Sequence, residues 1–182
     1  MKQKKINLHL GAGKRNIPNF VNVDLSNHKH IHYKRNVSDL KIFSNNSVDY
    51  IYASHVLEYF DFDEGLKTLK EWRRVLKPKA ILRISIPNFE SLIKVYKKIK
   101  NIDKVIGPLF GKMKVNKKTF YHKSTYDFNK IKNLLKKSGF KDIKKYNWKD
   151  TWHRDYDDHS KAYYPHKNQR GILISLNIYA KK

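Results

Sequence analysis

The first half of the chain alternates short apolar runs with amphipathic stretches. The runs with strand character are Ile6 to Leu10, Val21 to Asp24, His30 to Val37, Val48 to Ala53 and Ala80 to Ile86. The fourth of these is nearly apolar throughout, as a strand covered on both faces should be. Strand signals that alternate with helix signals in this way predict a parallel α/β sheet.

Three amphipathic helices are predicted between and after these strands. The first begins with the acidic turn at Asp61 and keeps one apolar face until Pro78 stops it. The second follows Pro87, and the third opens near Ser124 and ends at Gly139. Lysines occupy the faces of the second and third helices that are expected to be exposed to solvent, as is usual for amphipathic helices.

The two ends of the sheet carry further information. Residues 172–179 alternate apolar and polar positions, which predicts an antiparallel last strand with one packed face. Only ten residues, Lys14 to Val23, separate Gly13 from Asp24, whereas a parallel crossover normally needs a dozen or more. We therefore expect an α/β fold: a Rossmann-like, doubly wound, mostly parallel sheet with an antiparallel last strand and a shortened first crossover helix.

The length and composition of the chain limit the number of domains and the classes of protein that it can belong to. A chain of 182 residues corresponds to one domain, 1–182, with an inserted basic segment at 101–123 and a long loop at 148–170. No apolar run of about 18 residues is present, and the basic start Met1 to Lys5 lacks a signal peptide's apolar core. We expect a soluble, cytoplasmic protein without a membrane span. The absence of cysteine excludes disulfides, thiolate zinc sites and cysteine nucleophiles.

The formal net charge of +24 has two explanations that remain open. It is typical of proteins with a nucleic-acid or acidic-surface partner. However, 33 lysines stand against 7 arginines, as AT-rich codons produce, while phosphate binders favour the planar fork of arginine. The charge is lopsided: residues 94–182 carry 24 basic and 7 acidic side chains, and residues 1–93 carry 16 and 9.

Candidate ligand-binding residues follow three neighbouring strands. Gly11-Ala12-Gly13 comes directly after the first strand, where missing side chains let a ligand approach the backbone. Asp24 ends the second strand, where a carboxylate can accept both hydroxyls of a ribose. Asp39 follows the third strand and could accept from an exocyclic amine. Because open α/β sheets bind ligands at the carboxyl ends of their strands, this order predicts a nucleoside cofactor.

Several segments together resemble the class I S-adenosylmethionine-dependent methyltransferases. The likeness spans roughly residues 5–148 and the last strand. The segments that carry it are Leu8 to Gly13, Val21 to Leu25, Val37 to Leu40, Ser47 to Tyr59, Trp72 to Ala80, His122 to Phe128 and Leu134 to Phe140.

The resemblance implies that S-adenosylmethionine binds along this edge and leaves as S-adenosylhomocysteine. The glycine turn would face the methionine part, the end of the second strand the ribose, the end of the third strand the adenine, and the residues after the fourth strand the sulfonium. The cofactor-binding residues implied in this way are Gly11, Ala12, Gly13, Asp24, Leu25, Asp39, Leu40, Ser54 and His55.

Two departures from the family pattern affect this picture. His9 stands where the family usually has an acidic residue, which puts that residue's contact with the cofactor's amino group in doubt. Without a full helix after the glycine turn, Lys14 or Arg15 would supply the positive charge for a carboxylate. A nicotinamide cofactor is disfavoured, because Asn16 replaces the third glycine and the acid at Asp24 comes too soon.

Methyl transfer from a sulfonium is an in-line displacement in which positioning does most of the work. A base is needed only when the acceptor is protonated. His55, after the fourth strand, is the first candidate for such a catalytic residue, and His153 in the late loop is the second. Tyr52-Ala53-Ser54-His55 replaces the Asn/Asp-Pro-Pro-aromatic run of enzymes that methylate exocyclic amines of bases, which favours small-molecule acceptors.

The long loop gives the remaining information about the acceptor. Trp148 to His166 is rich in aromatic and ionisable side chains, which predicts a folded wall over an acceptor pocket that suits a sugar or other polar ring. The leading hypothesis is O- or N-methyl transfer to a small-molecule or glycan acceptor. The alternatives are an RNA methyltransferase that grips phosphates with its basic second half, and a non-catalytic cofactor-binding domain. The sequence does not specify an oligomeric state.

Two histidine-containing groups have spacings that metal ligands also use. His28, His30 and His32 could share one face of a strand, and the segment from His153 to His159 mixes histidine with aspartate. Spacing alone is weak support for a metal site, so we interpret both groups as solvated strand and loop residues and predict no metal.

Overall fold

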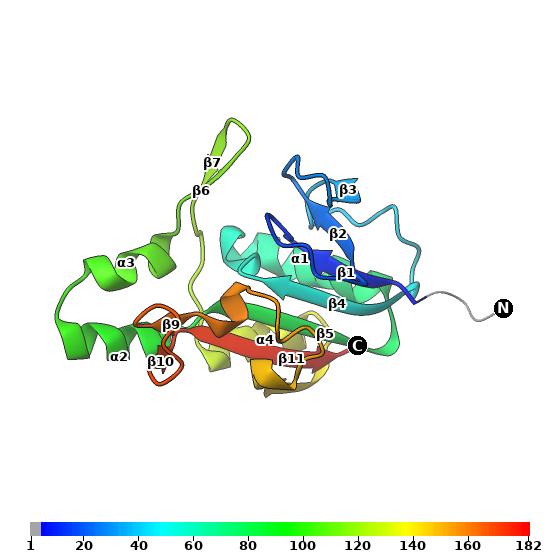
Figure 1. Ribbon diagram of the computed structural model, residues 1–182. Coiled ribbons are helices and arrows are strands. Elements are labelled where there is room, and N and C mark those ends of the chain that lie inside the picture. The colour runs from blue at the N-terminus through cyan, green and yellow to red at the C-terminus, as the bar shows by residue number, and fades with distance from the viewer. Residues whose placement is uncertain (1–4) are drawn as a thin grey trace.

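The computed structural model describes residues 5–182, and the basic start at residues 1–4 lies outside them. One sheet with the strand order β3-β2-β1-β4-β5-β11-β8 forms its centre (Figure 1). The strands β1 to β5 run parallel, whereas β11 is antiparallel to both β5 and β8. This confirms the predicted fold class. The strands are β1 Asn7–Leu10, β2 Val21–Asp24, β3 Tyr33–Lys34, β4 Val48–Ser54, β5 Leu76–Pro87, β8 Lys141–Lys145 and β11 Ser175–Lys181.

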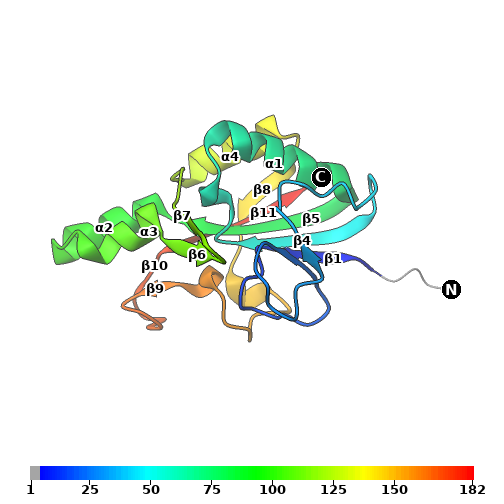
Figure 2. The same cartoon turned by 90° about the horizontal axis from the view of Figure 1, so that it is seen from above.

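The two faces of the sheet are covered differently. Helices α1 (Phe62–Val75) and α4 (Phe128–Lys137) lie side by side on one face (Figure 2). The other face carries irregular chain and the short 3-10 helices η2 (Trp148–Asp150) and η3 (His159–Lys161). Residues 11–20, between β1 and β2, contain no helix at all, so the first crossover is shortened as expected.

The ends of the first and third helices differ from the predictions. Helix α1 begins with a reciprocal Asp61–Glu64 capping box but ends at Val75, not at Pro78. Leu76 already pairs with Val48, and the residue before a proline disfavours helical backbone. Helix α4 begins at Phe128, not near Ser124, because the Asp127 side chain accepts from the Lys130 N–H and caps the helix there.

The late strands also differ from the expectation. The predicted strand over residues 172–179 is two strands: β10 (Ile172–Leu173) pairs with β9 (Tyr163–Tyr164), and β11 begins at Ser175. Residues 175–178 are all buried, so the expectation of a single packed face is wrong. The reason is that β11 lies between two other strands and has chain packed on both of its faces. The third predicted strand shrinks to the two residues of β3.

A projection extends from the sheet beyond β5. Helix α2 (Phe89–Ile99) leads outward, α3 (Asp103–Phe110) returns beside it, and a hairpin of β6 (Met113–Val115) and β7 (Lys118–Phe120) follows (Figure 1). The inserted basic segment predicted at 101–123 thus folds as a helix and a hairpin. Among residues 5–182, every helix is too short or too polar to cross a membrane.

Candidate functional site

A cavity of about 1140 Å³ opens at the carboxyl ends of β1, β2 and β4. Its floor comes from the turns that follow these strands. The end of α3, the β6–β7 hairpin and residues 157–167 form its other walls. Seven of the predicted site residues line it: Gly11, Gly13, Arg15, Asp24, Leu25, Ser54 and His55.

The two glycines of the turn, Gly11 and Gly13, lack a side chain for different structural reasons. Both have a positive φ, +70° at Gly11 and +52° at Gly13, where L side chains are strained. A Cβ on Gly11 would also lie 2.2 Å from Cγ2 of Val56, so this glycine is required for packing. A Cβ on Gly13 would meet nothing within 4 Å, so at this position the bare backbone faces open space beside the cavity.

Asp24 lines the cavity and also stabilises the surrounding backbone. Its Oδ2 accepts from the Gly13 N–H at 3.0 Å, and its Oδ1 accepts from the Ser26 N–H at 2.7 Å. The side chain therefore forms an Asx turn and ties the glycine turn to β2. A carboxylate has about four acceptor sites, so lone pairs remain for a ligand hydroxyl.

Arg15 connects the glycine turn to the late loop. Its Nε donates to the Asp157 carbonyl at 3.0 Å, and its Nη2 lies 3.4 Å from Nε2 of His159. Since arginine can only donate, His159 Nε2 accepts, and its ring proton is on Nδ1. The guanidinium is therefore fixed at the cavity wall, with donors left over for an anionic group.

The late loop is anchored to the face of the sheet. Asp158 accepts from the Tyr52 hydroxyl and from the Ser160 N–H, and the Asn177 side chain donates to the Ser160 carbonyl at 2.9 Å. These buried bonds fix the segment that carries His159 into the cavity wall.

Three predicted cofactor residues do not line the cavity. Asp39 is about half exposed and pairs with Arg35 at 3.8 Å, while Leu40 is fully buried and its N–H donates to Glu71 Oε1 at 3.0 Å. Neither residue lines the cavity, and the adenine contact expected at them stays a prediction. Ala12 is buried at the centre of the glycine turn.

Asn36 and Val37 line the cavity where Asp39 and Leu40 were expected. The third strand ends at Lys34, which makes Asn36 the first residue after it with a side-chain amide. Asn36 was not predicted because we expected a carboxylate, not an amide, to contact the adenine. An amide carries both a donor and an acceptor, which also suits the edge of a purine.

His153, the second catalytic candidate, lies in the core. It is 2% exposed and packs against Tyr52, with 4.3 Å between ring centroids, and edge-on against Phe20 at 5.8 Å. Burial lowers the pKa of His153 to about 4. The structure thus gives it no access to the cavity. His9 is buried against the same two aromatic rings, and burial lowers the pKa of His9 to about 4.

His55 lines the cavity and has a left-handed backbone, with φ +54°. Its Nε2 lies 2.9 Å from Ser175 Oγ, and its Nδ1 lies 3.3 Å from Glu58 Oε1. The Ser175 hydroxyl donates to the His159 carbonyl, so its oxygen must accept from His55. His55 therefore carries its proton on Nε2, and its Nδ1 has a lone pair directed at Glu58.

Glu58 is the acidic residue that the sequence analysis missed. It is fully buried, and burial raises the pKa of its carboxyl to about 8. His122 approaches from the other side: its Nε2 lies 3.9 Å from Glu58 Oε1, and its Nδ1 donates to the Pro108 carbonyl. Burial also lowers the pKa of His55 well below its ordinary value. At neutral pH a protonated Glu58 thus lies between two uncharged imidazoles.

The signal for Glu58 is present in the chain. An acid within the apolar turn Val56-Leu57-Glu58-Tyr59, directly after a buried strand, is out of place unless it is protonated or paired. Periodicity does not identify which histidines will surround it, because His122 is 64 residues away in the sequence.

Two hydroxyl groups in the cavity are available to bind a polar ligand. Oγ of Ser54 and Oγ of Ser26 are buried, line the cavity and have no hydrogen-bond partner among residues 5–182. A buried hydroxyl without a partner is unfavourable, so both are available to a polar ligand. Together with the open backbone at Gly13 and the fixed Arg15, they fit a ligand with hydroxyl and carboxylate groups.

The histidines near β2 have structural partners. The His30 ring donates from Nε2 to the Gly13 carbonyl at 2.9 Å, and His32 Nδ1 accepts from the Asn22 N–H at 3.0 Å. His28 stacks on His30 with 5.6 Å between ring centroids. Within residues 5–182, no three histidine, aspartate or glutamate side chains are grouped as a metal site would require.

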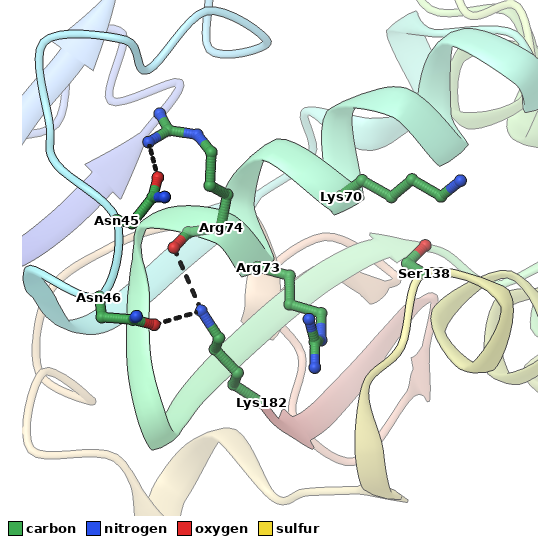
Figure 3. Close-up of a pocket in the computed structure, with 7 residues that line it drawn as sticks. All are labelled: Asn45, Asn46, Lys70, Arg73, Arg74, Ser138 and Lys182. Carbon is green, nitrogen blue, oxygen red and sulfur yellow. Dashed lines mark hydrogen bonds between the residues drawn. The ribbon is translucent and has the colours of Figure 1, made fainter.

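A second, smaller cavity of about 430 Å³ lies at the opposite edge of the sheet (Figure 3). Its charged groups mostly hold neighbouring chain in place. Arg74 binds Glu71 and the carbonyls of Phe43 and Leu40, and the Lys182 ammonium donates to three oxygens, including Asn46 Oδ1. We therefore assign a structural role to this cavity.

The fold is the one found in S-adenosylmethionine-dependent methyltransferases. Residues 14–84 match the sequence profile of a family described as "Methyltransferase domain". The chain has the arrangement of S-adenosylmethionine-dependent methyltransferases, which confirms the resemblance seen in the sequence.

Two curated relatives match part of the chain. A demethylmenaquinone methyltransferase of Staphylococcus haemolyticus is 33% identical over 109 residues, which is 56% of this chain and 44% of that protein. The enzyme of the same name from Staphylococcus epidermidis is 32% identical over 108 residues, with the same two shares. The match thus spans less than half the length of these relatives.

Solved structures share the fold over nearly the whole chain. An S-adenosylmethionine-dependent methyltransferase of Thermotoga maritima, described as a possible histamine N-methyltransferase, has a TM-score of 0.60 at 18% identity and covers 99% of this chain and 83% of its own. One from Archaeoglobus fulgidus has a TM-score of 0.60 at 17% identity and covers 100% of this chain and 87% of its own.

Proposed function

We propose that this chain is an S-adenosylmethionine-dependent methyltransferase that binds its cofactor in the cavity at the carboxyl edge of the sheet. The observation that carries the proposal is the convergence of the glycine turn, Asp24, Arg15 and Ser54 on one cavity. The methyltransferase family match over residues 14–84 supports the same cofactor.

Each part of the cofactor has a suitable partner in this cavity. The backbone at Gly13 and the Arg15 guanidinium would hold the amino-acid part, and Asp24 would accept from the ribose hydroxyls. Asn36 and Val37 would take the adenine, in place of the Asp39 and Leu40 expected from sequence. A charge-assisted bond from each ionised group would contribute about 1.5–3 kcal/mol.

The acceptor would enter from the side of α3 and the late loop. This side offers aromatic and polar groups at Tyr163, His166 and Lys167, as well as the apolar Met113. Such a lining suits a small molecule or a glycan-type ring with polar substituents. The names of the curated relatives, demethylmenaquinone methyltransferases, support a small-molecule acceptor.

When bound, S-adenosylmethionine would supply a methyl group on a positively charged sulfur that is ready for in-line displacement. The protein would then contribute chiefly by holding the acceptor in line, which can lower a barrier by about 7–11 kcal/mol. An oxygen or nitrogen acceptor with an acidic proton needs a base in addition.

We assign the role of that base to His55, with Glu58 as the positioning residue that controls it. Neither carboxyl oxygen of Glu58 has a hydrogen-bond partner among residues 5–182. While Glu58 is protonated, its hydroxyl would turn toward His55 Nδ1, 3.3 Å away, and His55 Nε2 would carry a proton and could not accept another. Once Glu58 ionises, it instead accepts from a proton on Nδ1, and Nε2 is left with a lone pair. An acceptor that replaces Ser175 at Nε2 could then give up its proton there.

The cofactor assignment is tested by calorimetry with S-adenosylhomocysteine. Asp24→Asn should weaken binding at least tenfold, since a neutral amide cannot form the charge-assisted ribose contact. Asp39→Asn is the matched control, because it makes the same chemical change outside the cavity, and it should leave the dissociation constant unchanged. Circular dichroism would show that both variants fold. Equal dissociation constants for the two variants would remove Asp24 from the site.

A further inference from the structure

The projection formed by α2 and α3 presents an apolar surface to solvent. On α2, Phe89, Ile93 and Tyr96 follow at helical spacing. Ile102, directly before α3, has the same spacing with Ile106 and Phe110 on α3. All six side chains are between 38% and 62% exposed. We call these six residues the α2–α3 face.

The α2–α3 face is not needed to hold the two helices together. A separate set of side chains, Leu92, Val95 and Val105, forms the buried contact between them. The exposed residues lie roughly a quarter turn from this buried set on each helix. Helix α3 returns beside α2 in the opposite direction (Figure 1). It follows from this direction and from the helical spacing that the two exposed stripes fall on the same side of the pair. The result is one apolar surface on a convex projection.

Lysines surround the α2–α3 face. Residues 89–110 contain five lysines and two acids, a net charge of +3, and all five lysine side chains are exposed. Lys97 and Lys98 occupy the last turn of α2. A second copy of this chain would bring the same charge against itself, and the whole chain carries +24, so self-association is disfavoured. The surface suits a partner that is both apolar and acidic.

We propose that the α2–α3 face docks on a membrane surface rich in anionic lipids. The apolar side chains would enter the boundary between headgroups and acyl chains while the lysines contact lipid phosphates, as in amphipathic helices that lie in this interface. A convex projection with large apolar tips fits a deformable lipid surface better than a protein groove. The same segment lines the cavity at Gly107, Pro108 and Gly111, so docking brings the cavity close to the lipid.

The test is co-sedimentation of the full chain with vesicles. Vesicles of phosphatidylcholine mixed with an equal part of phosphatidylglycerol should bind the protein, and binding should weaken as salt increases. Vesicles of phosphatidylcholine alone should bind it far less. The double variant Ile106→Ser with Phe110→Ser should lower the partition coefficient roughly tenfold or more, because both tips are lost from the lipid boundary.

Two lysine variants separate local docking from general attraction. Lys97→Gln with Lys98→Gln should reduce binding to the anionic vesicles roughly tenfold. Lys136→Gln with Lys137→Gln removes the same charge from the last turn of α4, on the sheet's helical face, and should leave binding nearly unchanged. Thermal unfolding would show that all variants keep the fold.

Three results would overturn the proposal. The first is no preference of the wild-type chain for anionic vesicles, and the second is an equal loss in the two lysine variants. The third is competition by soluble polyglutamate as effective as that by anionic vesicles, which would point to an acidic protein partner. None of these results depends on methyl transfer, so the docking proposal and the proposed function can fail separately.

Discussion

Burial determines which protons the candidate site can exchange. Glu58 has no exposed surface, and its carboxyl keeps its proton up to a pKa of about 8, where an exposed glutamate would have lost it. The two histidines beside it, His55 and His122, have pKa values lowered by burial and stay neutral. The group is therefore arranged to lose one proton slightly above neutral pH.

The rate of methyl transfer to a protonated acceptor should rise with pH through about 8. Above this pH Glu58 is ionised, and His55 Nε2 can accept a proton. In Glu58→Gln the side-chain amide N–H can donate to His55 Nδ1 as the protonated acid would, but the amide cannot ionise, so the rate should fall and lose this pH dependence. Glu90→Gln, at an exposed position on α2, is the control. A rise through pH 8 that persists in Glu58→Gln would contradict the assignment.

Buried neutral histidines should make the fold sensitive to acid. The pKa of His153 is about 4 in the folded chain, against an ordinary 6.5 when unfolded. Between these values the unfolded state binds more protons, so the free energy of unfolding rises with pH from 4 to 6.5 and is lost as pH falls. The shift corresponds to about 3 kcal/mol for His153, and His9 behaves in the same way.

Urea unfolding at a series of pH values checks this account. His153→Phe keeps an aromatic ring in contact with Phe20 and Tyr52 and should flatten the pH dependence between 4 and 6.5. His166→Phe changes an exposed histidine in the same loop and should leave the slope as in the wild type. An unchanged slope in His153→Phe would mean that this residue does not titrate as proposed.

Single residues of the site could be predicted from sequence where the chain position alone fixes them. The glycine turn and Asp24 directly follow strands with clear patterns, and the structure has them at one cavity. Asp39 and His153 were chosen for their chemistry, but Asp39 lies outside the cavity and pairs with Arg35. His153 is buried against Tyr52, a contact between distant parts of the chain that no local pattern reveals. Glu58 has a local signal, an acid within the apolar turn after β4, but the sequence does not reveal that His122 packs beside it.

Among the elements, α1 links the core to the cavity. Trp72 is fully buried on this helix, and its indole N–H donates to the Val37 carbonyl at 2.8 Å. Val37 lines the cavity where the adenine is proposed to bind. One side chain of α1 thus fixes the backbone of the loop that follows β3, a loop with little regular structure of its own.

Loss of this bond should destabilise the fold and loosen the cofactor site. Trp72→Phe leaves the Val37 carbonyl buried without its donor and removes part of a packed ring, at a cost of roughly 2–4 kcal/mol. Trp152→Phe is the matched control, since Trp152 is 50% exposed, and it should cost far less. Chemical denaturation measures both. Similar losses of stability in the two variants would show that the hydrogen bond from Trp72 to the Val37 carbonyl does not contribute appreciably to the free energy of unfolding.

The elements themselves were predictable where one signal dominated. The strand at residues 21–24 was located to the residue, because valine alternates with a polar residue from Val21 to Asp24. The ends of α1 and α4 were misplaced, since the pairing of Leu76 with Val48 and the cap at Asp127 compete with the helical pattern. The β9–β10 pair was missed because each strand is only two residues long and residues 165–171 separate them, so no regular alternation marks the pair.

In the whole molecule, the packing elements lie on the two faces of the sheet and the candidate binding site lies at one edge of it. Helices cover one face of the sheet and the late loop covers the other (Figure 2). This loop is rich in aromatic side chains. The cavity lies at the carboxyl edge. The excess of lysine is spread over the wet faces of helices, as the codon explanation expects, but on α2 and α3 it surrounds exposed apolar side chains. This coincidence distinguishes the projection from the rest of the charged surface.

The most direct test of the central claim is a crystal structure of the chain with S-adenosylhomocysteine. We expect the ribose hydroxyls on Asp24, the adenine beside Asn36 and Val37, and the carboxylate next to Arg15. This expectation would be contradicted by a ligand seated elsewhere, such as the smaller cavity beside Arg73, or by an empty cavity at a saturating ligand concentration.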